Sequence, residues 1–264
     1  MSLVFSAIVP HPPLLIPAIG KENIKKLAKT KAALEQLEED LYISQPETLM
    51  IISPHGPMLS DSFCLNVSQR YEANLKDFGD LTTRLAFEPN LNLMLKIREA
   101  AQDKNLPVAL QTDPDLDYGA AVPLYYLTKH LPKIKIVPVS FSLLDGKTHL
   151  DFGYLLKEQI MTANDRVAVI ASADLAHTLS SDGPGGFRPQ AKVFDETVIA
   201  NLESHNTTGL LNIDAAVAKT AAECGYRSIL ILLGILQRVN YDLKILSYEG
   251  PLGIGYLVAN FVLK

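Results

Sequence analysis

The sequence has few cysteines, no strong excess of one charge and no long apolar run. Each of these absences argues against a particular class of protein. Cys64 and Cys224 are the only cysteines among 264 residues, so we expect no disulfide framework and take a reducing cytoplasm as the compartment. The net charge is −5, and no basic stripe with interleaved aromatic residues occurs, which argues against nucleic-acid binding. No apolar run reaches the ~18 residues of a membrane span. The first residues, Met1–Phe5, lack the charged region of a signal peptide.

The chain does contain enough apolar residues for a substantial core. Hydrophobic residues make up 48% of it, and its length suits one large α/β domain or two small ones. No linker divides the sequence and no internal repeat is visible. The only long segment rich in glycine, serine and proline is 178–189. We therefore expect a single domain over residues 1–264.

Apolar segments with strand-like composition alternate with segments of helical periodicity. Strands are expected at Leu3–Val9, Thr48–Ser53, Phe63–Ser68, Pro107–Gln111, Ile134–Ser140, Arg166–Ser172, Lys244–Glu249 and Tyr256–Val262. Helices are expected at Lys21–Leu41, Leu91–Asp103, Val122–His130, His149–Thr162, Gln190–Ser204 and Asp214–Gln237, the last with a break near Gly225. Apolar strands separated by helices are typical of an α/β fold, here with a central mixed, mostly parallel sheet covered by helices on both faces.

Two histidines follow apolar strands inside turns that are bracketed by proline. They are His11 in Val9-Pro10-His11-Pro12-Pro13 and His55 in Ser53-Pro54-His55-Gly56-Pro57. Ligands of α/β sheets bind beyond the carboxyl ends of the strands, so the two turns should meet. Proline limits local motion, which suits a metal ligand that must keep its direction. An imidazole that only hydrogen-bonds its own turn would give the same pattern.

A third metal ligand should be a carboxylate or another histidine. The candidate carboxylates are Glu223, Asp174, Asp61 and Glu249. Glu223 is favoured because it opens a very apolar helical segment, where an unpaired charge would be costly. A salt bridge to Arg227 is the alternative role for Glu223. Two imidazoles and one carboxylate form the facial triad of non-haem Fe(II) oxygenases, and the same ligands bind Zn²⁺ or Mn²⁺.

Cys224, beside Glu223, offers a second possible ligand set. Two imidazoles and a thiolate would favour zinc or copper over Fe(II) oxygen chemistry. The alternative for Cys224 is a small buried apolar residue without a chemical role.

His177 follows the strand expected at 166–172 and is the candidate general acid or base. An unperturbed imidazole titrates at about pH 6.5, so it can take and give a proton near neutrality. A buried structural histidine is the alternative. Asp174, three residues earlier, is placed to orient His177 or to cap the following turn. The remaining histidines lie among polar neighbours and are expected at the surface: His130, His149 and His205.

A set of motifs that spans essentially the whole chain resembles the class III extradiol ring-cleavage dioxygenases, the LigB-like superfamily. The motifs are Pro10–Pro13, Ile51–Pro57, Asp117–Gly119 with Val122–Leu124, Ser172–His177, Asp182–Pro184, Glu223–Gly225 with Arg227–Ser228, and Ser247–Pro251 with Gly253–Tyr256. They occur in the family order. The chain is most similar to the microbial branch that also forms the amino-terminal domain of proteins with an AMMECR-type domain, and Memo is a more distant relative.

The resemblance implies an α/β sandwich in which His11, His55 and Glu223 bind Fe(II) and His177 is the acid or base. Characterised members bind a catechol to the metal through both oxygens and use O₂ to open the ring beside the diol. The implied function is opening of a catechol-like or aminophenol-like ring, with a small aromatic substrate and O₂ as partners. Relatives often form homodimers.

Two alternatives to ring cleavage follow from the same motifs. Memo-like relatives keep the fold, have a cysteine where Cys224 falls, and are not established dioxygenases. They imply a protein that binds a metal or a partner without ring cleavage. The other alternative is a zinc hydrolase that activates water at the same ligands.

Tyr118 departs from the family pattern. Many relatives carry Asp-His-Gly where this chain has Asp117-Tyr118-Gly119, and that histidine lies in the active site near substrate and oxygen. We therefore expect Tyr118 in the site. A tyrosine can donate a hydrogen bond, but with a pKa of about 10 it is a poor base at neutral pH.

Overall fold

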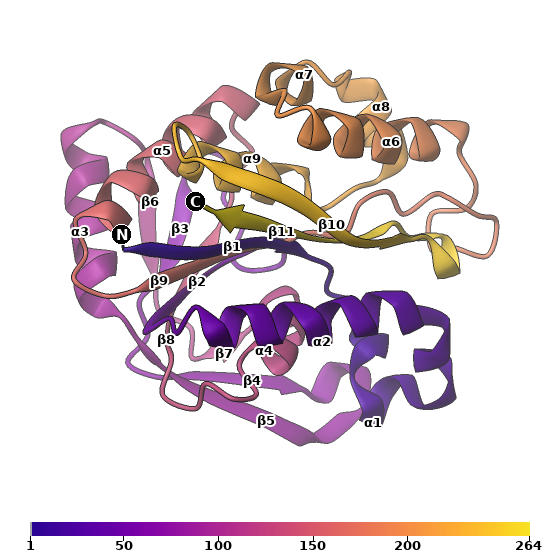
Figure 1. The fold of residues 1–264 in the computed structure, drawn as a ribbon, viewed down its shortest axis with the longest axis horizontal. Helices are drawn as coiled ribbons and strands as arrows, with labels where there is room; N and C mark the ends of the chain where they lie inside the picture. Colours follow the sequence, from indigo (N-terminus) through magenta and orange to yellow (C-terminus); the bar gives the residue numbers. More distant parts are fainter. Residues whose placement is uncertain (1) are drawn as a thin grey trace.

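A computed structural model describes residues 2–264 and contains an 11-stranded mixed sheet (Figure 1). The strand order is β10-β11-β1-β9-β2-β8-β5-β4-β7, and β3 pairs with both β6 and β8. The strands are β1 Leu3–Val9, β2 Thr48–Ser53, β3 Phe63–Asn66, β4 Tyr71–Leu75, β5 Asp80–Pro89, β6 Val108–Gln111, β7 Asp115–Leu116, β8 Lys135–Ser140, β9 Val167–Ser172, β10 Tyr241–Glu249 and β11 Tyr256–Leu263. Strands β1, β9, β2 and β8 are parallel, whereas β11 runs antiparallel to β1 and β10.

Helices cover both faces of the sheet. The helices are α1 Pro17–Gly20, α2 Ala28–Ile43, α3 Leu91–Asp103, α4 Tyr118–Leu127, α5 Gly146–Met161, α6 Pro189–Glu203, α7 Thr207–Leu211, α8 Ala215–Ala221 and α9 Tyr226–Ile235. Helices α2 and α4 pack on one face, and α5 and α9 on the other (Figure 1). The expected α/β fold, with a mixed sheet between helical layers, is therefore confirmed.

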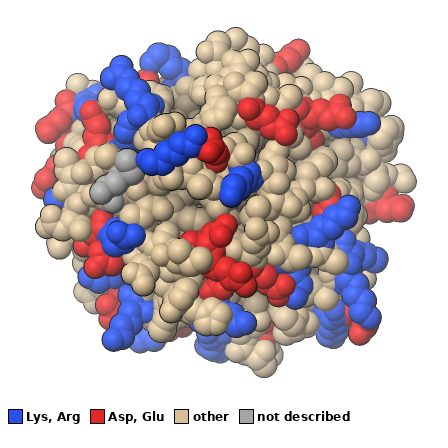
Figure 2. Space-filling model, viewed as in Figure 1, with Lys and Arg blue, Asp and Glu red and all other residues tan. Residues whose placement is uncertain are grey.

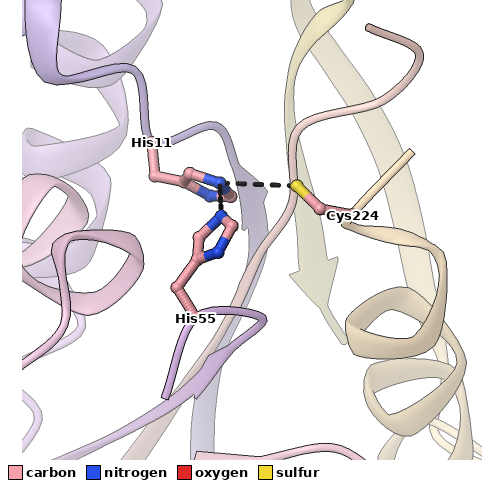
Figure 3. Close-up of side chains that lie close together, drawn as sticks. All are labelled: His11, His55 and Cys224. Carbon is pink, nitrogen blue, oxygen red and sulfur yellow. Dashed lines mark hydrogen bonds between the residues drawn. The ribbon is translucent and has the colours of Figure 1, made fainter. Parts of the chain in front are cut away.

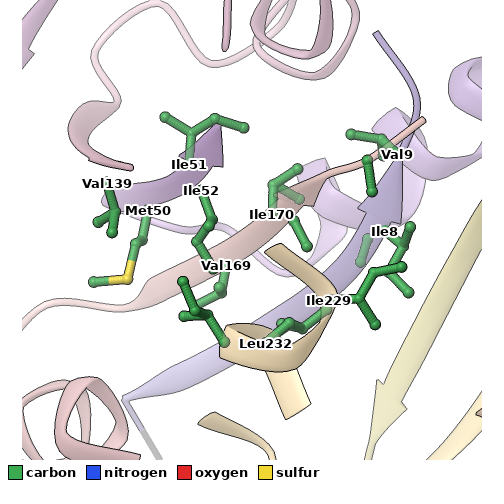
Figure 4. Packing of buried hydrophobic residues seen from close by; sticks show 14 of the residues in the cluster. Ile8, Val9, Met50, Ile51, Ile52, Val139, Val169, Ile170, Ile229 and Leu232 are labelled. Carbon is green, nitrogen blue, oxygen red and sulfur yellow. The ribbon is translucent and has the colours of Figure 1, made fainter. Parts of the chain in front are cut away.

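The centre of the sheet forms the core. Every residue of β2 and β9 is buried, because these parallel strands have helices on both faces. Ile229 and Leu232 of α9 point toward Ile8 and Val169 on the neighbouring strands (Figure 4). Full burial of each such aliphatic side chain contributes about 1.5–3 kcal/mol. This packing holds the carboxyl ends of β1, β2 and β9 at fixed positions.

Several helix boundaries differ from the sequence expectation. The segment Lys21–Leu27 is a 3₁₀-helix, so the α-helix begins only at Ala28. Helix α4 begins at Tyr118, earlier than expected, because the Asp117 side chain caps it by accepting from the Ala120 N–H. The break expected near Gly225 is confirmed, since α8 ends at Ala221 and α9 begins at Tyr226.

Strands β4, β5 and β7 were not expected from the sequence. β5 touches the main sheet only at Glu88 and Pro89, where it pairs with β8, and then pairs with β4 over most of its length. Most of its residues are partly or fully exposed, so it lacks the continuous apolar run of a central strand. The hairpin brings Phe78, between β4 and β5, against the ring of Tyr118, with centroids 5.1 Å apart.

The expectation that His149 lies at the surface is wrong. It is fully buried, with Nδ1 2.7 Å from the Asp145 carbonyl and Nε2 3.1 Å from the Ser142 carbonyl. The polar neighbours of His149 in the sequence suggested an exposed position. The imidazole is nevertheless satisfied inside the protein, because backbone carbonyls of the preceding turn bind both of its nitrogens. His130 and His205 are exposed, as expected.

Acidic and basic side chains are interspersed over the face shown in Figure 2, which presents no continuous basic surface. Among the helices of residues 2–264, none combines the length and the apolar character that crossing a membrane requires.

Candidate metal centre

The two histidine turns meet at the carboxyl ends of three neighbouring parallel strands. Val9, the last residue of β1, is in register with Ser172, the last residue of β9. Strand β2 lies on the other side of β9 and ends at Ser53. His11 and His55 each follow their strand by two residues, so the sheet delivers both imidazoles to one place.

Cys224 completes a group of three possible metal ligands with these histidines (Figure 3). The Nε2 atoms of His11 and His55 are 3.1 Å apart, and Cys224 Sγ is 3.5 Å from His11 Nε2. One ligand atom from each residue lies within 4.8 Å of the others. Cys224 reaches this place from the loop between α8 and α9.

The spacing of these atoms fits a metal ion. A tetrahedral ion with metal–nitrogen bonds of about 2.0 Å and metal–sulfur bonds of about 2.3 Å separates two nitrogens by about 3.3 Å, and nitrogen from sulfur by about 3.5 Å. The observed separations are 3.1 Å and 3.5 Å. Both separations from His11 Nε2 are therefore close to those of a tetrahedral site, and the third separation, between the ligand atoms of His55 and Cys224, is at most 4.8 Å.

The hydrogen-bond partner of His11 fixes its tautomer. Ser172 Oγ donates to the carbonyl of Gly119 at 2.5 Å, so its single hydrogen is already used. The same oxygen lies 2.8 Å from His11 Nδ1 and must accept a hydrogen from that nitrogen. Nε2 is consequently the nitrogen of His11 that carries the lone pair, and it faces His55 and Cys224. An outer partner of this kind is the usual support of a metal-binding histidine.

Burial keeps the imidazoles in their neutral form. Burial, with smaller contributions from His55 and His177, lowers the pKa of His11 well below its usual value. Burial and then His177 lower the pKa of His55 to about 4. A neutral imidazole is the form that binds a metal.

Gly225 allows Cys224 to approach the site. A Cβ at Gly225 would lie 2.4 Å from the Cβ of Ala173 and 2.7 Å from the carbonyl oxygen of Asp174. The Gly225 N–H instead donates to that carbonyl at 3.0 Å, and Cys224 Sγ lies 3.7 Å from it. Burial, followed by the charge of Asp174, raises the pKa of the Cys224 thiol well above its usual value. A metal that binds here must displace the thiol proton.

Tyr118 lies directly beside His55. Its hydroxyl is 2.8 Å from His55 Nε2, and the two rings stack with centroids 4.3 Å apart. Burial raises the pKa of Tyr118 above its usual value, so the group is a phenol at neutral pH. The Asp117 cap sets this position, since it starts α4 at Tyr118.

Asp174 contacts His11 through both carboxylate oxygens. Oδ1 accepts from the His11 backbone N–H at 2.8 Å, and Oδ2 is 3.6 Å from Nε2. The side chain is buried, and burial raises its pKa to about 7. Asp174 therefore holds the His11 turn and adds an ionisable oxygen near the cluster.

His177 influences both histidines electrostatically, since a charge on its imidazole adds to burial in lowering the pKa of each. Its backbone N–H donates to the Ala221 carbonyl at 2.8 Å, and its Nδ1 lies 3.0 Å from the Leu175 carbonyl. A carbonyl only accepts, so Nδ1 carries the hydrogen and Nε2 is the basic nitrogen. Burial lowers the pKa of His177.

Glu223 does not belong to this group. Its Oε2 accepts from the backbone N–H of Tyr226 at 2.6 Å and so caps the first turn of α9. Burial raises its pKa to about 7, opposed by the Tyr226 hydrogen bond and by Arg227. The two other candidate carboxylates have different places: Asp61 is exposed, and Glu249 accepts from Thr30 at the start of α2.

The structure thus brings together His11, His55 and Cys224, with Tyr118 and Asp174 beside them. Sequence reasoning missed the supporting residues Ser172, Asp117 and Gly225. All three lie within the motifs that identified the family, but only the folded chain shows which atoms they bind.

Comparison with known proteins agrees with this architecture. The family model described as the catalytic LigB subunit of aromatic ring-opening dioxygenase matches residues 6–259. A protein of Clostridium acetobutylicum is 33% identical over 97% of this chain, which spans 57% of that protein's length. A MEMO1 family protein of Methanosarcina mazei is 28% identical over 38% of the chain and 34% of its own length.

A solved structure shares the fold. The crystal structure of an uncharacterized protein from Escherichia coli K12 superposes with a TM-score of 0.70 and 17% identity, covering 98% of this chain and 99% of that one. The match of the family model over nearly the whole chain decides the assignment. This chain belongs to the LigB family and has MEMO1 family proteins among its distant relatives.

Proposed function

We propose that this protein binds a transition-metal ion, zinc or copper, through His11, His55 and Cys224. One observation carries the proposal: Cys224 Sγ lies 3.5 Å from His11 Nε2, while the neighbouring carboxylate of Glu223 caps α9. Imidazole and thiolate ligands favour these metals over the hard cations that carboxylates bind. The proposal agrees with membership of a family whose distant relatives are MEMO1 proteins.

Each surrounding side chain has a role in such a centre. Ser172 would keep the Nε2 lone pair of His11 available to a bound ion, and Tyr118 places a phenol hydroxyl beside His55. Asp174, with a pKa near 7, can accept the proton that Cys224 releases on binding. When bound, the ion would supply Lewis-acid or redox chemistry at this edge of the sheet.

Metal analysis of two neighbouring variants tests the ligand set. Metal-free protein is titrated anaerobically with Zn²⁺ and Cu⁺ in competition with a chelator, and the bound ion is measured by mass spectrometry. We expect Cys224→Ser to weaken binding at least about 10-fold, the low end of losses from perturbed metal sites, and Glu223→Gln to retain it. The reverse ranking would replace Cys224 by Glu223 as the third ligand. Cys64→Ser controls for the loss of a thiol as such, since Cys64 lies in β3.

Ring opening is the second candidate function, favoured by the Tyr118 hydroxyl beside His55, by the electrostatic influence of His177 on His55 and by the family model. In this reading Fe(II) would be held by His11, His55 and Glu223. His177 Nε2 would take a proton from a catechol-like or aminophenol-like substrate, and the Tyr118 hydroxyl would donate a hydrogen bond. Glu223 would have to release the Tyr226 N–H in order to bind a metal.

Fe(II) reconstitution tests ring opening directly. The protein is loaded with Fe(II) under argon, its iron content is measured, and O₂ uptake is followed with a panel of catechols and aminophenols. Ring-opened products absorb visible light, which gives a second signal. O₂ uptake that is stoichiometric with product supports the candidate. A fully iron-loaded sample that turns over no member of the panel would remove it.

A further inference from the structure

Asp195 of α6 is a carboxylate with no exposed surface, and it lies outside the metal cluster. Oδ1 accepts from the backbone N–H of Ala176 at 2.9 Å, and Oδ2 accepts from the hydroxyl of Tyr248 at 2.6 Å. Both donors are uncharged. Burying a carboxylate against neutral donors is unfavourable, and burial accordingly raises the pKa of Asp195 to about 6. A hydrophobic side chain could pack between α6 and its neighbours without this desolvation cost. The presence of a carboxylate therefore indicates a role other than packing.

The Asp195 contact falls on the segment that carries His177. Ala176 immediately precedes His177, and its N–H is the group that Asp195 binds. The other backbone groups of this segment are bound from two further directions. Leu175 N–H donates to the Gly255 carbonyl, and Gly255 N–H donates to the Ala176 carbonyl, both at 2.8 Å. His177 N–H donates to Ala221 at the end of α8.

Three separate elements therefore fix the segment 175–177. Gly255, directly before β11, and the end of α8 bind it through backbone groups, and α6 binds it through one side chain. Without Asp195, the buried N–H of Ala176 would have no acceptor, and the peptide that leads into His177 could rotate to find one. The direction of the His177 imidazole depends on that peptide, since Nδ1 is held by the carbonyl of Leu175 in the same segment.

The surroundings of Asp195 leave no freedom to the carboxylate itself. A Cβ at Gly255 would lie 2.1 Å from Asp195 Oδ2, so a glycine is required where the carboxylate passes the backbone. Tyr248 of β10 occupies the same oxygen from the other side. The Asp195 side chain is thus held at both oxygens and against the Gly255 backbone. Such a rigid side chain can fix the position of the backbone group that it binds.

We propose that Asp195 is a positioning residue for His177: by binding the Ala176 N–H, it fixes the direction of the His177 imidazole. The role of His177 in proton transfer rests on the proposed function, whereas the effect of Asp195 on the imidazole does not. The readout is therefore taken on metal-free protein, where failure of the metal or ring-opening proposals has no influence.

Three variants separate positioning from plain structural support. Asp195→Leu keeps the branched shape but removes the acceptor, and Asp195→Asn keeps an oxygen for Ala176. Tyr248→Phe removes the second hydrogen bond of the carboxylate and leaves the Ala176 contact in place. The ¹⁵N chemical shifts of the His177 imidazole, which report its tautomer and hydrogen bonding, are measured by NMR for each variant, together with the melting temperature.

We expect Asp195→Leu to displace the His177 imidazole resonances and abolish the pure Nδ1–H tautomer, while leaving those of His149 in place. Asp195→Asn should restore the wild-type signals, and Tyr248→Phe should keep them even if it lowers the melting temperature. A leucine variant that melts earlier but shows wild-type His177 signals would overturn the proposal, as would His177 signals displaced equally by Tyr248→Phe. If the leucine variant does not fold, Asp195→Ala, which leaves room for a water molecule, is judged by the same criteria.

Discussion

Ser172 Oγ lies 2.8 Å from His11 Nδ1 while donating its own hydrogen to the Gly119 carbonyl. One hydroxyl thereby joins β9, the His11 turn and the start of α4. It also decides which nitrogen of His11 can bind a metal, which makes it the most direct target for mutation outside the ligands.

Ser172→Ala should weaken metal binding about 10- to 100-fold, as is typical for loss of an outer partner of a metal-binding histidine. It should also lower the free energy of unfolding by about 1–3 kcal/mol, since the buried Gly119 carbonyl loses its donor. Chelator competition and urea denaturation measure the two effects.

Ser6→Ala is the matched control for Ser172→Ala. Ser6 is a fully buried serine on the adjacent strand β1, and its Oγ has no hydrogen-bond partner within residues 2–264. Its removal should leave metal affinity unchanged and should not destabilise the fold. Equal metal affinity in the two alanine variants and the wild type would show that Ser172 does not orient His11.

Gly225→Ala should displace Cys224 and lower metal affinity. The added Cβ would stand 2.4 Å from the Cβ of Ala173 and 2.6 Å from its Cα, and backbone cannot yield as a flexible side chain can. Overpacking of this kind costs about 1–3 kcal/mol. Gly250→Ala is the control, because its Cβ would meet first the end of the Leu179 side chain, at 3.0 Å. Metal affinities are compared at a temperature where both variants are folded.

Glu223→Gln should change the pH dependence of stability. Burial raises the pKa of Glu223 from 4.5 to about 7 in the folded protein, so between these values the folded state holds more protons than the unfolded state. The contribution of Glu223 to stability therefore falls as pH rises through this window. Glutamine can still accept from Tyr226 but does not ionise.

The free energy of unfolding of metal-free Glu223→Gln, relative to wild type, should therefore increase from pH 4 to pH 8, with most of the change between about pH 4.5 and pH 7. Urea denaturation across this range gives the comparison, and pH 4 is the internal reference, where Glu223 is mainly protonated in both states. A difference that stays constant from pH 4 to pH 8 would show that Glu223 ionises normally.

The sequence predicts the strands that carry the site more closely than it predicts which side chains meet there. The expected boundaries of β1, β2 and β9 agree with the structure to within one residue. Strands that are buried on both faces consist of continuous apolar residues, which makes them easy to recognise. The choice between Glu223 and Cys224 could not be made that way. Ala222, directly before these two residues, adopts a left-handed conformation with φ of 53°. Sequence patterns do not resolve the direction of adjacent residues in such a turn.

Tyr118→His should raise ring-opening activity in Fe(II)-loaded protein if the second candidate function holds. Tyr118 lies 2.8 Å from His55 Nε2, and its raised pKa keeps it a phenol that donates but does not accept protons. A histidine there restores the pattern of many relatives and adds a general base. A positioned acid or base contributes about 10²- to 10⁴-fold to rate, which sets the size of the expected gain.

The comparison requires Tyr118→Phe measured beside Tyr118→His. Phenylalanine keeps the ring that stacks on His55 and packs against Phe78 but has no polar atom, so it should not gain activity. Initial rates of O₂ uptake are normalised to bound iron, so that a change in metal loading does not count as catalysis. Equal rates in the two variants would mean that a base at this position does not limit the reaction, and the tyrosine would then have to be explained by its hydrogen bond to His55.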